Sequence, residues 1–202
     1  MLFRSLAAYP DLVVTGLGVL QPALQSGGTM TIQWSDSNTG DGDAAGGWWD
    51  RVKVVNTTTG ETLVNQLVWS GDPAAAGGSV AREYSFKLPD GDAGVGDLSI
   101  EVTADIQGTV FEHNGDGTAE TNNTATTTAT SSLAAYPDLV VTGLGVLQPA
   151  LQSGGTMTIQ WSDSNTGDGA AVVGWWDRIK VVNTTTGETL VNQLVWSGDP
   201  AD

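Results

Sequence analysis

Oxygen-bearing side chains gather in a flexible loop, "DSNTGDGD", at residues 36–43. A second group follows in the turn "DGD" at residues 90–92. Calcium takes about six to eight oxygen ligands in a loose geometry, and the carboxylate and amide oxygens of such loops are suitable donors. The pattern therefore predicts a candidate calcium site. Its candidate ligands are Asp36, Asn38, Asp41, Asp43, Asp90 and Asp92.

The same residues also fit ordinary turns, in which Asp and Asn side chains bond to their own backbone. The loop lacks the bidentate Glu of an EF-hand, and Gly40 occupies a position that would carry a ligand. In a second copy of the loop, Ala170 replaces Asp43. A calcium site and a set of solvated turns both stay open, and we expect no required cofactor.

Residues suited to catalysis are scarce in this chain. His113 is the only histidine, and there is no cysteine. One histidine supports neither a His-based zinc site nor a Ser-His-Asp triad. Two carboxylates could form a glycosidase pair, but most of the Asp residues fall in turns. We predict that the protein is not an enzyme and has no catalytic residues.

The segment "GWWDR" at residues 47–51 combines aromatic and charged side chains. Strand alternation sends Trp48 into a core and Trp49 outward, beside Arg51 and Lys53. Trp49 could lie over these basic side chains, stack on a sugar, or anchor a protein interface. Trp176 repeats Trp49 in the second copy, so both are candidate interface or ligand residues.

Alternation of apolar and polar residues with a period of two dominates the chain, and helical spacing is missing. The pattern predicts an all-β, antiparallel sandwich of about seven strands. Met30, Ile32 and Trp34 share one predicted inner face. The expected strands cover 11–20, 29–34, 47–55, 61–69, 81–88, 98–104 and 122–130.

Residues 6–75 recur at 133–202 with an offset of 127 residues. A period of this length corresponds to a whole domain rather than to a solenoid unit. We expect residues 6–132 to be a complete domain, 133–202 to be the front half of a second, and 1–5 to be a linker or an artificial edge. The copies differ only at Asp43/Ala170, Ala45/Val172, Gly46/Val173, Val52/Ile179 and Ala75/Asp202.

The front half at 133–202 lacks counterparts of residues 79–131. Its apolar side chains are expected to face an empty side, so this half should be unfolded or should bind a partner. We expect ordinary closure of 6–132 within one chain, with exchange between identical chains as the alternative. The side chains concerned are Val141, Met157, Ile159, Trp161, Trp175, Val181, Leu194 and Trp196.

The chain has 23 acidic and 7 basic residues, a formal net charge of −16. This balance argues against nucleic acid and anionic membranes as partners, because both select Lys and Arg patches. No run of about 18 apolar residues occurs, so we expect no membrane span in these residues. We expect an extracellular or cell-surface protein, with its secretion signal outside these residues.

Five segments, in order, resemble the landmarks of the CARDB domain, the cell-adhesion-related domain found in bacteria. The resemblance implies an immunoglobulin-like β-sandwich on surface and secreted proteins, often in tandem, without known catalytic residues. Trp49 and the long loop between Glu112 and Glu120 depart from the family pattern. The segments are "YPDLVVTGL", "GGTMTIQWSDSNTG", "WWDRVKVV", "SFKLPDG" and "VFEHNGDGTAETNNTAT".

Repetition, acidity and the family resemblance together predict a non-enzymatic extracellular repeat module. It would serve as a spacer, a stalk or an adhesive fibre element of a large bacterial surface protein. One alternative is a filament-forming, pilus-like subunit whose half-domain is completed by a neighbouring chain. Another is a carbohydrate-binding module that uses Trp49 and Trp176. The expected partners are neighbouring repeats or identical chains, and a cell-surface glycan or protein.

Overall fold

The computed structural model describes residues 7–198. The chain divides into two compact units, which meet between Leu133 and Ala134. They are called unit 1 and unit 2 below. The interpretation of residues 1–5 as a linker or an artificial edge concerns residues outside the described range.

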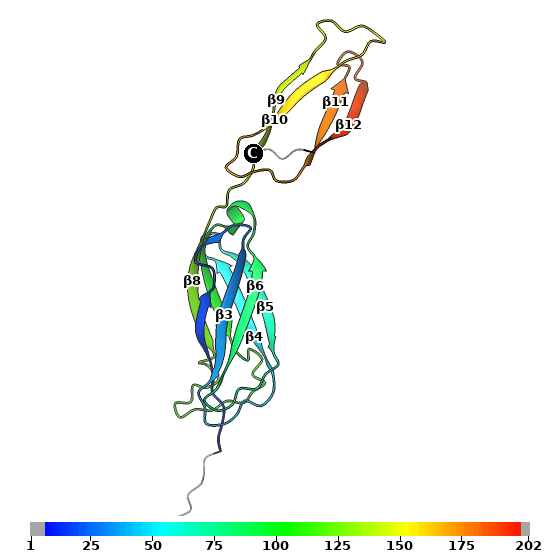
Figure 1. The fold of residues 1–202 in the computed structure, drawn as a ribbon. Coiled ribbons are helices and arrows are strands. Elements are labelled where there is room, and N and C mark those ends of the chain that lie inside the picture. The colour runs from blue at the N-terminus through cyan, green and yellow to red at the C-terminus, as the bar shows by residue number, and fades with distance from the viewer. Residues whose placement is uncertain (1–6, 199–202) are drawn as a thin grey trace, which may run out of the picture. The chain divides into compact units, whose positions relative to one another are not determined.

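Unit 1 is a sandwich of two β-sheets (Figure 1). One sheet has the order β1-β3-β6, and the other has the order β2-β8-β7-β4-β5. Every strand pair is antiparallel except β2 with β8, which is parallel. The predicted all-β antiparallel sandwich is therefore confirmed. The strands are β1 (Leu12–Val19), β2 (Leu24–Gln25), β3 (Thr29–Asn38), β4 (Trp48–Asn56), β5 (Glu61–Ser70), β6 (Ser79–Lys87), β7 (Gly96–Thr103) and β8 (Thr124–Ser132).

The seven longer strands lie where alternation predicted them. The sequence pattern did not predict two short elements. They are strand β2 and the 3-10 helix η1 (Gly91–Gly94), which overlaps the turn "DGD". Gly91 adopts a φ of 66°, a left-handed conformation that glycine adopts without strain. Both elements lie at the end of unit 1 from which the chain leaves.

The core lies between the two sheets, as the period-two pattern predicted. The side chains of Met30, Ile32 and Trp34 from β3 are buried. They pack in one cluster with inward side chains of the opposite sheet, because each strand turns alternate residues to the same face. The partners on β4 and β7 are Val52, Val54, Leu98, Ile100 and Val102. Tyr84 and Phe86 of β6 are half-buried and pack against this cluster.

A second apolar cluster closes the end of the sandwich at which the chain arrives. Trp48 and Leu12 are fully buried there, together with Ala44 and Ala74. Ala44 and Ala74 form a two-way backbone bridge between the loops that precede β4 and follow β5. This cluster fixes the start of β4, which carries Trp49 on its opposite face.

Among residues 134–198, unit 2 contains two separate β-hairpins. β9 (Leu139–Val146) pairs with β10 (Ile159–Asn165), and β11 (Trp175–Val182) pairs with β12 (Thr189–Ser197). They correspond to β1, β3, β4 and β5 of unit 1. A hairpin alone is only marginally stable in water, so these strands depend on what packs on them.

The prediction of which side chains face the empty side was wrong for Leu194 and Trp196. Their counterparts in the complete unit, Leu67 and Trp69, are also exposed, because they lie on the outer face of β5. The inner face at these positions is carried by the neighbouring residues of the strand. In unit 2, Val141 and Met157 are exposed on inner-face positions, as predicted.

Among residues 7–198, the structure contains no helix with the length and apolar character needed to cross a bilayer.

Candidate functional site

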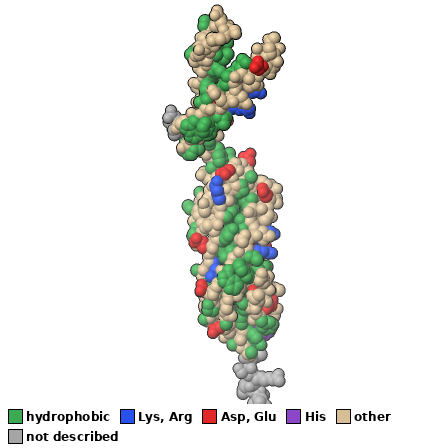
Figure 2. Space-filling model, turned by 90° about the vertical axis from the view of Figure 1, so that its right-hand side faces the viewer, with side chains coloured by type: hydrophobic (Ala, Val, Ile, Leu, Met, Phe, Trp, Pro, Cys, Tyr) green, Lys and Arg blue, Asp and Glu red, His purple; other side chains and the backbone are tan. Residues whose placement is uncertain are grey.

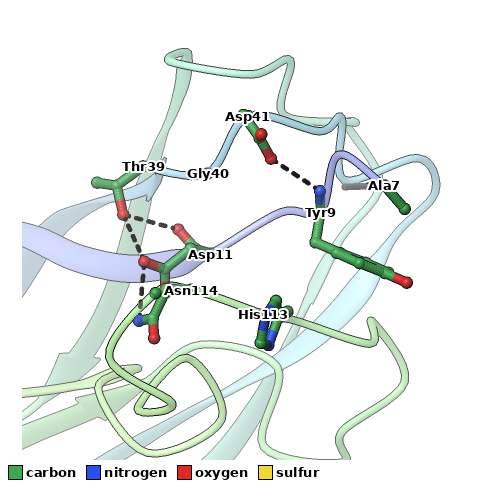
Figure 3. Close-up of a pocket in the computed structure, with 9 residues that line it drawn as sticks. Ala7, Tyr9, Asp11, Thr39, Gly40, Asp41, His113 and Asn114 are labelled. Atoms are coloured by element: carbon green, nitrogen blue, oxygen red, sulfur yellow. Dashed lines mark hydrogen bonds between the residues drawn. The ribbon is translucent and has the colours of Figure 1, made fainter. Parts of the chain in front are cut away.

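A polar pocket of about 330 Å³ lies at the arriving end of unit 1 (Figure 3). Residues 7–11, 39–41 and 113–115 form its walls. The Tyr9 amide donates a hydrogen bond to Asp41 Oδ1 at 3.0 Å, and the Tyr9 ring lies edge-on to His113 at a centroid distance of 5.6 Å. Its lining residues are Ala7, Tyr9, Asp11, Thr39, Gly40, Asp41, His113, Asn114 and Gly115.

Asp11 is the anionic centre of this pocket. Its carboxylate accepts hydrogen bonds from Asn122 Nδ2 at 2.9 Å, Thr39 Oγ1 at 3.0 Å and Asn114 Nδ2 at 3.2 Å. Burial acts to raise the pKa of Asp11, but these three donors outweigh it and hold the pKa below its ordinary value. The carboxylate is therefore ionised at neutral pH, with its oxygens engaged by protein donors.

Asn38, a candidate calcium ligand, is used as a structural bracket. Its Oδ1 accepts from the Asp11 amide at 3.0 Å and from the Gly40 amide at 3.1 Å. Its Nδ2 donates to the carbonyls of Gly42 at 2.8 Å and Ala74 at 3.0 Å. The buried side chain thus joins the first strand, its own loop and the loop after β5. The same Asn-to-carbonyl bond recurs at Asn165 in unit 2.

The other candidate ligands lie in separate places. Asp36 is buried in the core, and Asp43 accepts a hydrogen bond from the Ala76 amide at 2.9 Å. Asp90 pairs with Lys87 Nζ at 3.0 Å, and Asp92 lies in the first turn of η1, at the opposite end of the sandwich. Of the six candidates, Asn38, Asp41 and Asp43 share one loop region.

Within residues 7–198, no three His, Cys, Asp or Glu side chains are grouped so that they could hold a metal ion. The side-chain oxygens of this loop act as they do in ordinary turns. They accept hydrogen bonds from backbone N–H groups that are not paired within a strand. Calcium binding at this loop stays a prediction.

Trp49 lies on the outer face of the five-stranded sheet, directly opposite Trp69 of β5. The two rings are 5.1 Å apart between centroids and tilted by 55°. Trp69 is 53% exposed, whereas Trp49 is half-buried beneath it. We call these residues the tryptophan pair. The same arrangement recurs in unit 2 as Trp176 and Trp196, at 5.1 Å and 56°.

Gly47 provides the floor for the tryptophan pair. A Cβ added at this residue would overlap Trp69 Cζ2 and the Ser70 carbonyl oxygen. Only glycine therefore allows the indole to lie flat against the backbone. Gly174 has the same relation to Trp196 Cζ2, at 2.5 Å. The strand thus presents an exposed indole on a fixed support.

Packing of Trp49 over basic side chains was one of three alternatives, and the structure gives its indole an aromatic partner. Arg51 instead forms an ion pair with Glu101 of β7 at 2.6 Å, and the ring partner of Trp49 is Trp69. Sequence interpretation missed Trp69. The turn at 56–60 alone would not have found it, because Trp49 lies opposite Trp69 only through the register shift between Val54 and Val55.

A buried polar network, also missed, joins the two sheets. Trp34 Nε1 donates to Asp36 Oδ1 at 3.1 Å and to Asp50 Oδ2 at 3.3 Å. Arg82 of β6 donates from Nε to Asp36 Oδ2 at 3.0 Å and also bonds to Ser70 Oγ. Alternation from Trp48 could have placed Asp50 inward, since both share one face of β4.

Burial raises the pKa of Asp50 to about 8, and the neighbouring Asp36 carboxylate adds to the shift. Trp34 and Arg82 act in the opposite direction but do not cancel it. Burial also raises the pKa of Glu112 to about 7, although the Leu12 amide and Asn123 Nδ2 donate to it. Glu112 thereby links the start of β1 to the segment before β8, and Asp50 also accepts a hydrogen bond from the Asp105 amide at 3.4 Å.

Comparison with solved structures returns CARDB domains. A crystal structure of a CARDB domain from Pyrococcus furiosus, in complex with di-metal ions, is 21% identical, with a TM-score of 0.42, covering 64% of this chain and all of that domain. A solution structure of the same domain is 20% identical, with a TM-score of 0.43, covering 62% of this chain and 98% of that one. A β-glucosidase from Erythrobacter marinus is 11% identical over 60% of this chain and 15% of the enzyme, with a TM-score of 0.41.

No curated protein matches the sequence. Residues 9–127, which make up unit 1 from Tyr9 to the middle of β8, match the CARDB family. CARDB is a cell-adhesion-related domain family with an immunoglobulin-like β-sandwich, and it is not known as enzymatic. The chain belongs to the CARDB family.

Proposed function

We propose that this chain is a non-enzymatic extracellular repeat module that acts as a spacer or stalk, or as an adhesive fibre element, of a large bacterial surface protein. The observation that carries this proposal is the path of the chain through unit 1. The chain arrives at one end of the sandwich and leaves at the other. A domain of this kind adds its full length when it is repeated.

Hydrogen bonds define both ends of this path. At the arriving end, Asp11 accepts from Asn122 immediately before β8 begins. At the leaving end, the last residue of β8, Ser132, pairs with Gln25 and accepts a hydrogen bond from the Ser26 amide. The two points are separated by the nine residues of β8, about 30 Å at ~3.3 Å per residue.

The charge of the chain suits an extended array. A formal net charge of −16 makes neighbouring copies repel one another rather than associate. The repulsion is screened by salt over about 10 Å at 0.1 M ionic strength. An array would therefore stay extended and soluble while it projects a distal binding site.

Small-angle scattering on arrays of two, four and six copies of residues 6–132 tests this function. We expect the maximum dimension to grow in proportion to copy number, and to shorten modestly when salt screens the charge. A maximum dimension that stays nearly constant with copy number would mean that the copies fold back on one another, and would refute a spacer role.

A carbohydrate-binding role is the second candidate, and the tryptophan pair favours it. Trp69 and Trp196 present exposed indole faces on rigid glycine floors, in both copies. An exposed, preorganised aromatic ring suits stacking on the apolar face of a sugar. The adhesive target of the family name would then be a cell-surface glycan.

A glycan array tests this role. We expect Trp69→Ala with Trp196→Ala to abolish any glycan signal, and Trp49→Ala with Trp176→Ala to weaken it. Leu67→Ala with Leu194→Ala, on the same outer face, serves as the matched control. Absence of any glycan signal with the unaltered chain would remove this candidate.

The filament alternative gains little free energy from strand exchange. Residues 6–202 contain two front halves, 6–75 and 133–202, and one segment that covers such a half, 79–132. Exchange between chains therefore leaves the number of uncovered front halves unchanged. Light scattering that shows a monomer at all concentrations would exclude the filament.

A further inference from the structure

Unit 2 exposes apolar faces that are buried in unit 1. The inner side of its first hairpin carries Val141 and Met157, 56% and 38% exposed. Hydrophobic side chains gather on the visible surface of this unit in Figure 2. Large apolar side chains that are exposed in unit 2 and more buried in unit 1 are Leu139, Val140, Val141, Leu144, Val146, Leu151, Met157, Val182 and Leu190.

Unit 1 shows what covers the same sequence. β3 gains β6 along one edge, with Met30 opposite Phe86, and β4 gains β7 along one edge, with Val52 opposite Val102. In unit 2, the corresponding edges of β10 and β11 carry no strand among the described residues. Because register follows from the inward pattern, the free edges accept strands with the pattern of β6 and β7.

A hollow of about 340 Å³ marks one of these positions. It runs along the free edge of β11 at Arg178, Ile179 and Lys180, whose unit 1 counterparts are the residues that pair with β7. Its floor is Ile159 and Trp161, and Ile179 replaces Val52 as the only inward difference within these strands. The hollow is thus shaped by side chains that contact an added strand in unit 1.

The charges of unit 2 indicate one residue of the strand that would bind there. Asp163 and Asp177 correspond to Asp36 and Asp50, and in unit 2 they hydrogen bond to Trp175 and Trp161. No Lys or Arg side chain forms an ion pair with either carboxylate among residues 134–198. Partial desolvation, followed by the charge of Asp177, raises the pKa of Asp163. In unit 1, Arg82 of β6 occupies the equivalent site.

We infer that the open faces of unit 2 bind a strand-forming segment with the sequence pattern of residues 79–132, whose arginine at the position of Arg82 docks between Asp163 and Asp177. The source is a stretch of chain, in this or another molecule, in which this segment is unpaired. A second copy of this chain is a poor source, because its own segment already covers its unit 1. The interaction is independent of the spacer role.

The test adds an isolated peptide of residues 79–132 to the full chain in a calorimeter. We expect binding of one peptide per chain. Hydrogen exchange of residues 172–182 should slow, and their mass distinguishes them from 45–55 because Val172, Val173 and Ile179 differ from the first copy. Slower exchange at 172–182 without a change at 45–55 places the peptide on unit 2.

Charge variants test the arginine. Arg82→Met in the peptide should weaken binding at least about tenfold, because it leaves two facing carboxylates unpaired. Lys87→Met in the peptide is the matched control and should bind unchanged, since Lys87 pairs with Asp90 within the segment. A chain that carries both Asp163→Asn and Asp177→Asn should bind the Arg82→Met peptide and the unaltered peptide with equal affinity.

Three outcomes would overturn the inference: no binding by the unaltered peptide, equal affinity of the Arg82→Met peptide for the unaltered chain, or slowed exchange at 45–55 instead of 172–182. A chain that dimerises without peptide and thereby protects residues 172–182 would assign these faces to a second copy instead.

Discussion

The sequence "LVVTGLGV" forms a strand twice in this chain, at 12–19 and at 139–146, with opposite burial. Leu12 is fully buried in unit 1, whereas Leu139 is 40% exposed in unit 2. Both strands contain the same glycine with a φ of 62° and pair with the same hairpin partner sequence. Local sequence is therefore enough for the hairpin, and burial depends on residues more than sixty positions away.

The buried network makes the same comparison for charge. Trp34 donates to both carboxylates in unit 1, and Arg82 balances them. In unit 2, the carboxylates and indoles meet without an arginine, and the pairing of donors and acceptors differs. An inward pair of carboxylates therefore needs a cation from another strand to balance its charge.

Arg82→Met should make unit 1 resemble unit 2 and has the largest expected effect. We expect a loss of about 3–5 kcal/mol in the free energy of unfolding, because Asp36 and Asp50 stay buried without their cation. Urea denaturation followed by tryptophan fluorescence measures the loss. Lys87→Met, at an exposed ion pair, should change it by less than about 1 kcal/mol. Equal effects of the two variants would show that the network is not important for stability.

Leu12→Ala and Leu139→Ala compare identical side chains in the two units. The first should cost about 2–5 kcal/mol of unfolding free energy, since it opens a cavity in the core. The second should cost less than about 1 kcal/mol, because Leu139 is already exposed. Urea denaturation of both variants checks the difference. A large effect of Leu139→Ala would mean that unit 2 is covered in solution.

Asp50→Asn should remove part of the pH dependence of unit 1. Because folding raises the pKa of Asp50 from 3.8 to about 8, the folded state binds more protons, and stability is lost as pH rises between these two values. We expect the Asp50→Asn substitution to stabilise unit 1 at pH 9 by on the order of 2 kcal/mol and to have a much smaller effect at pH 5. Glu112, whose pKa is raised to about 7, retains its share of the dependence.

Urea denaturation at pH 5, 7 and 9 measures this dependence. Asp177→Asn, the counterpart in unit 2, is the control and should leave the pH dependence of unit 1 unchanged. An Asp50→Asn chain whose stability falls with pH as steeply as the unaltered chain would contradict the assignment.

Trp69→Ala and Trp196→Ala should have small and equal effects. The two indoles have the same exposure, 53% and 52%, and the same ring partner geometry. Each substitution removes one aromatic pair, worth about 0.5–1.5 kcal/mol. Thermal denaturation of each variant provides the measurement. A clearly larger effect in unit 1 would show that the outer face also depends on the covering strands.

Much of the fold could be predicted from the sequence, because its inner faces alternate cleanly. The inward positions of β3 and β7 follow from period two alone. The parallel contact of β2 with β8 could not be predicted, since it pairs two residues with a strand more than a hundred positions away.

The candidate site was harder to predict. Composition marked Asn38 and Asp43 as ligands, but it does not reveal that backbone amides already occupy their oxygens. Likewise, the inward position of Asp50 follows only from its alternation with Trp48 along β4. Trp49 was identified correctly as an outward residue, whereas its partner Trp69 required the register of the hairpin.

The opposite positions of the two chain ends in unit 1 have a mechanical consequence. Tension on the ends would pull β1 and β8 along their own axes, in different sheets. The ladder bonds of antiparallel strands run across that direction, so they are loaded in shear and share the force instead of opening singly. The register shift between Thr15 and Gly18 divides the β1 ladder into two groups of bonds. Slippage under load should therefore begin at this bulge.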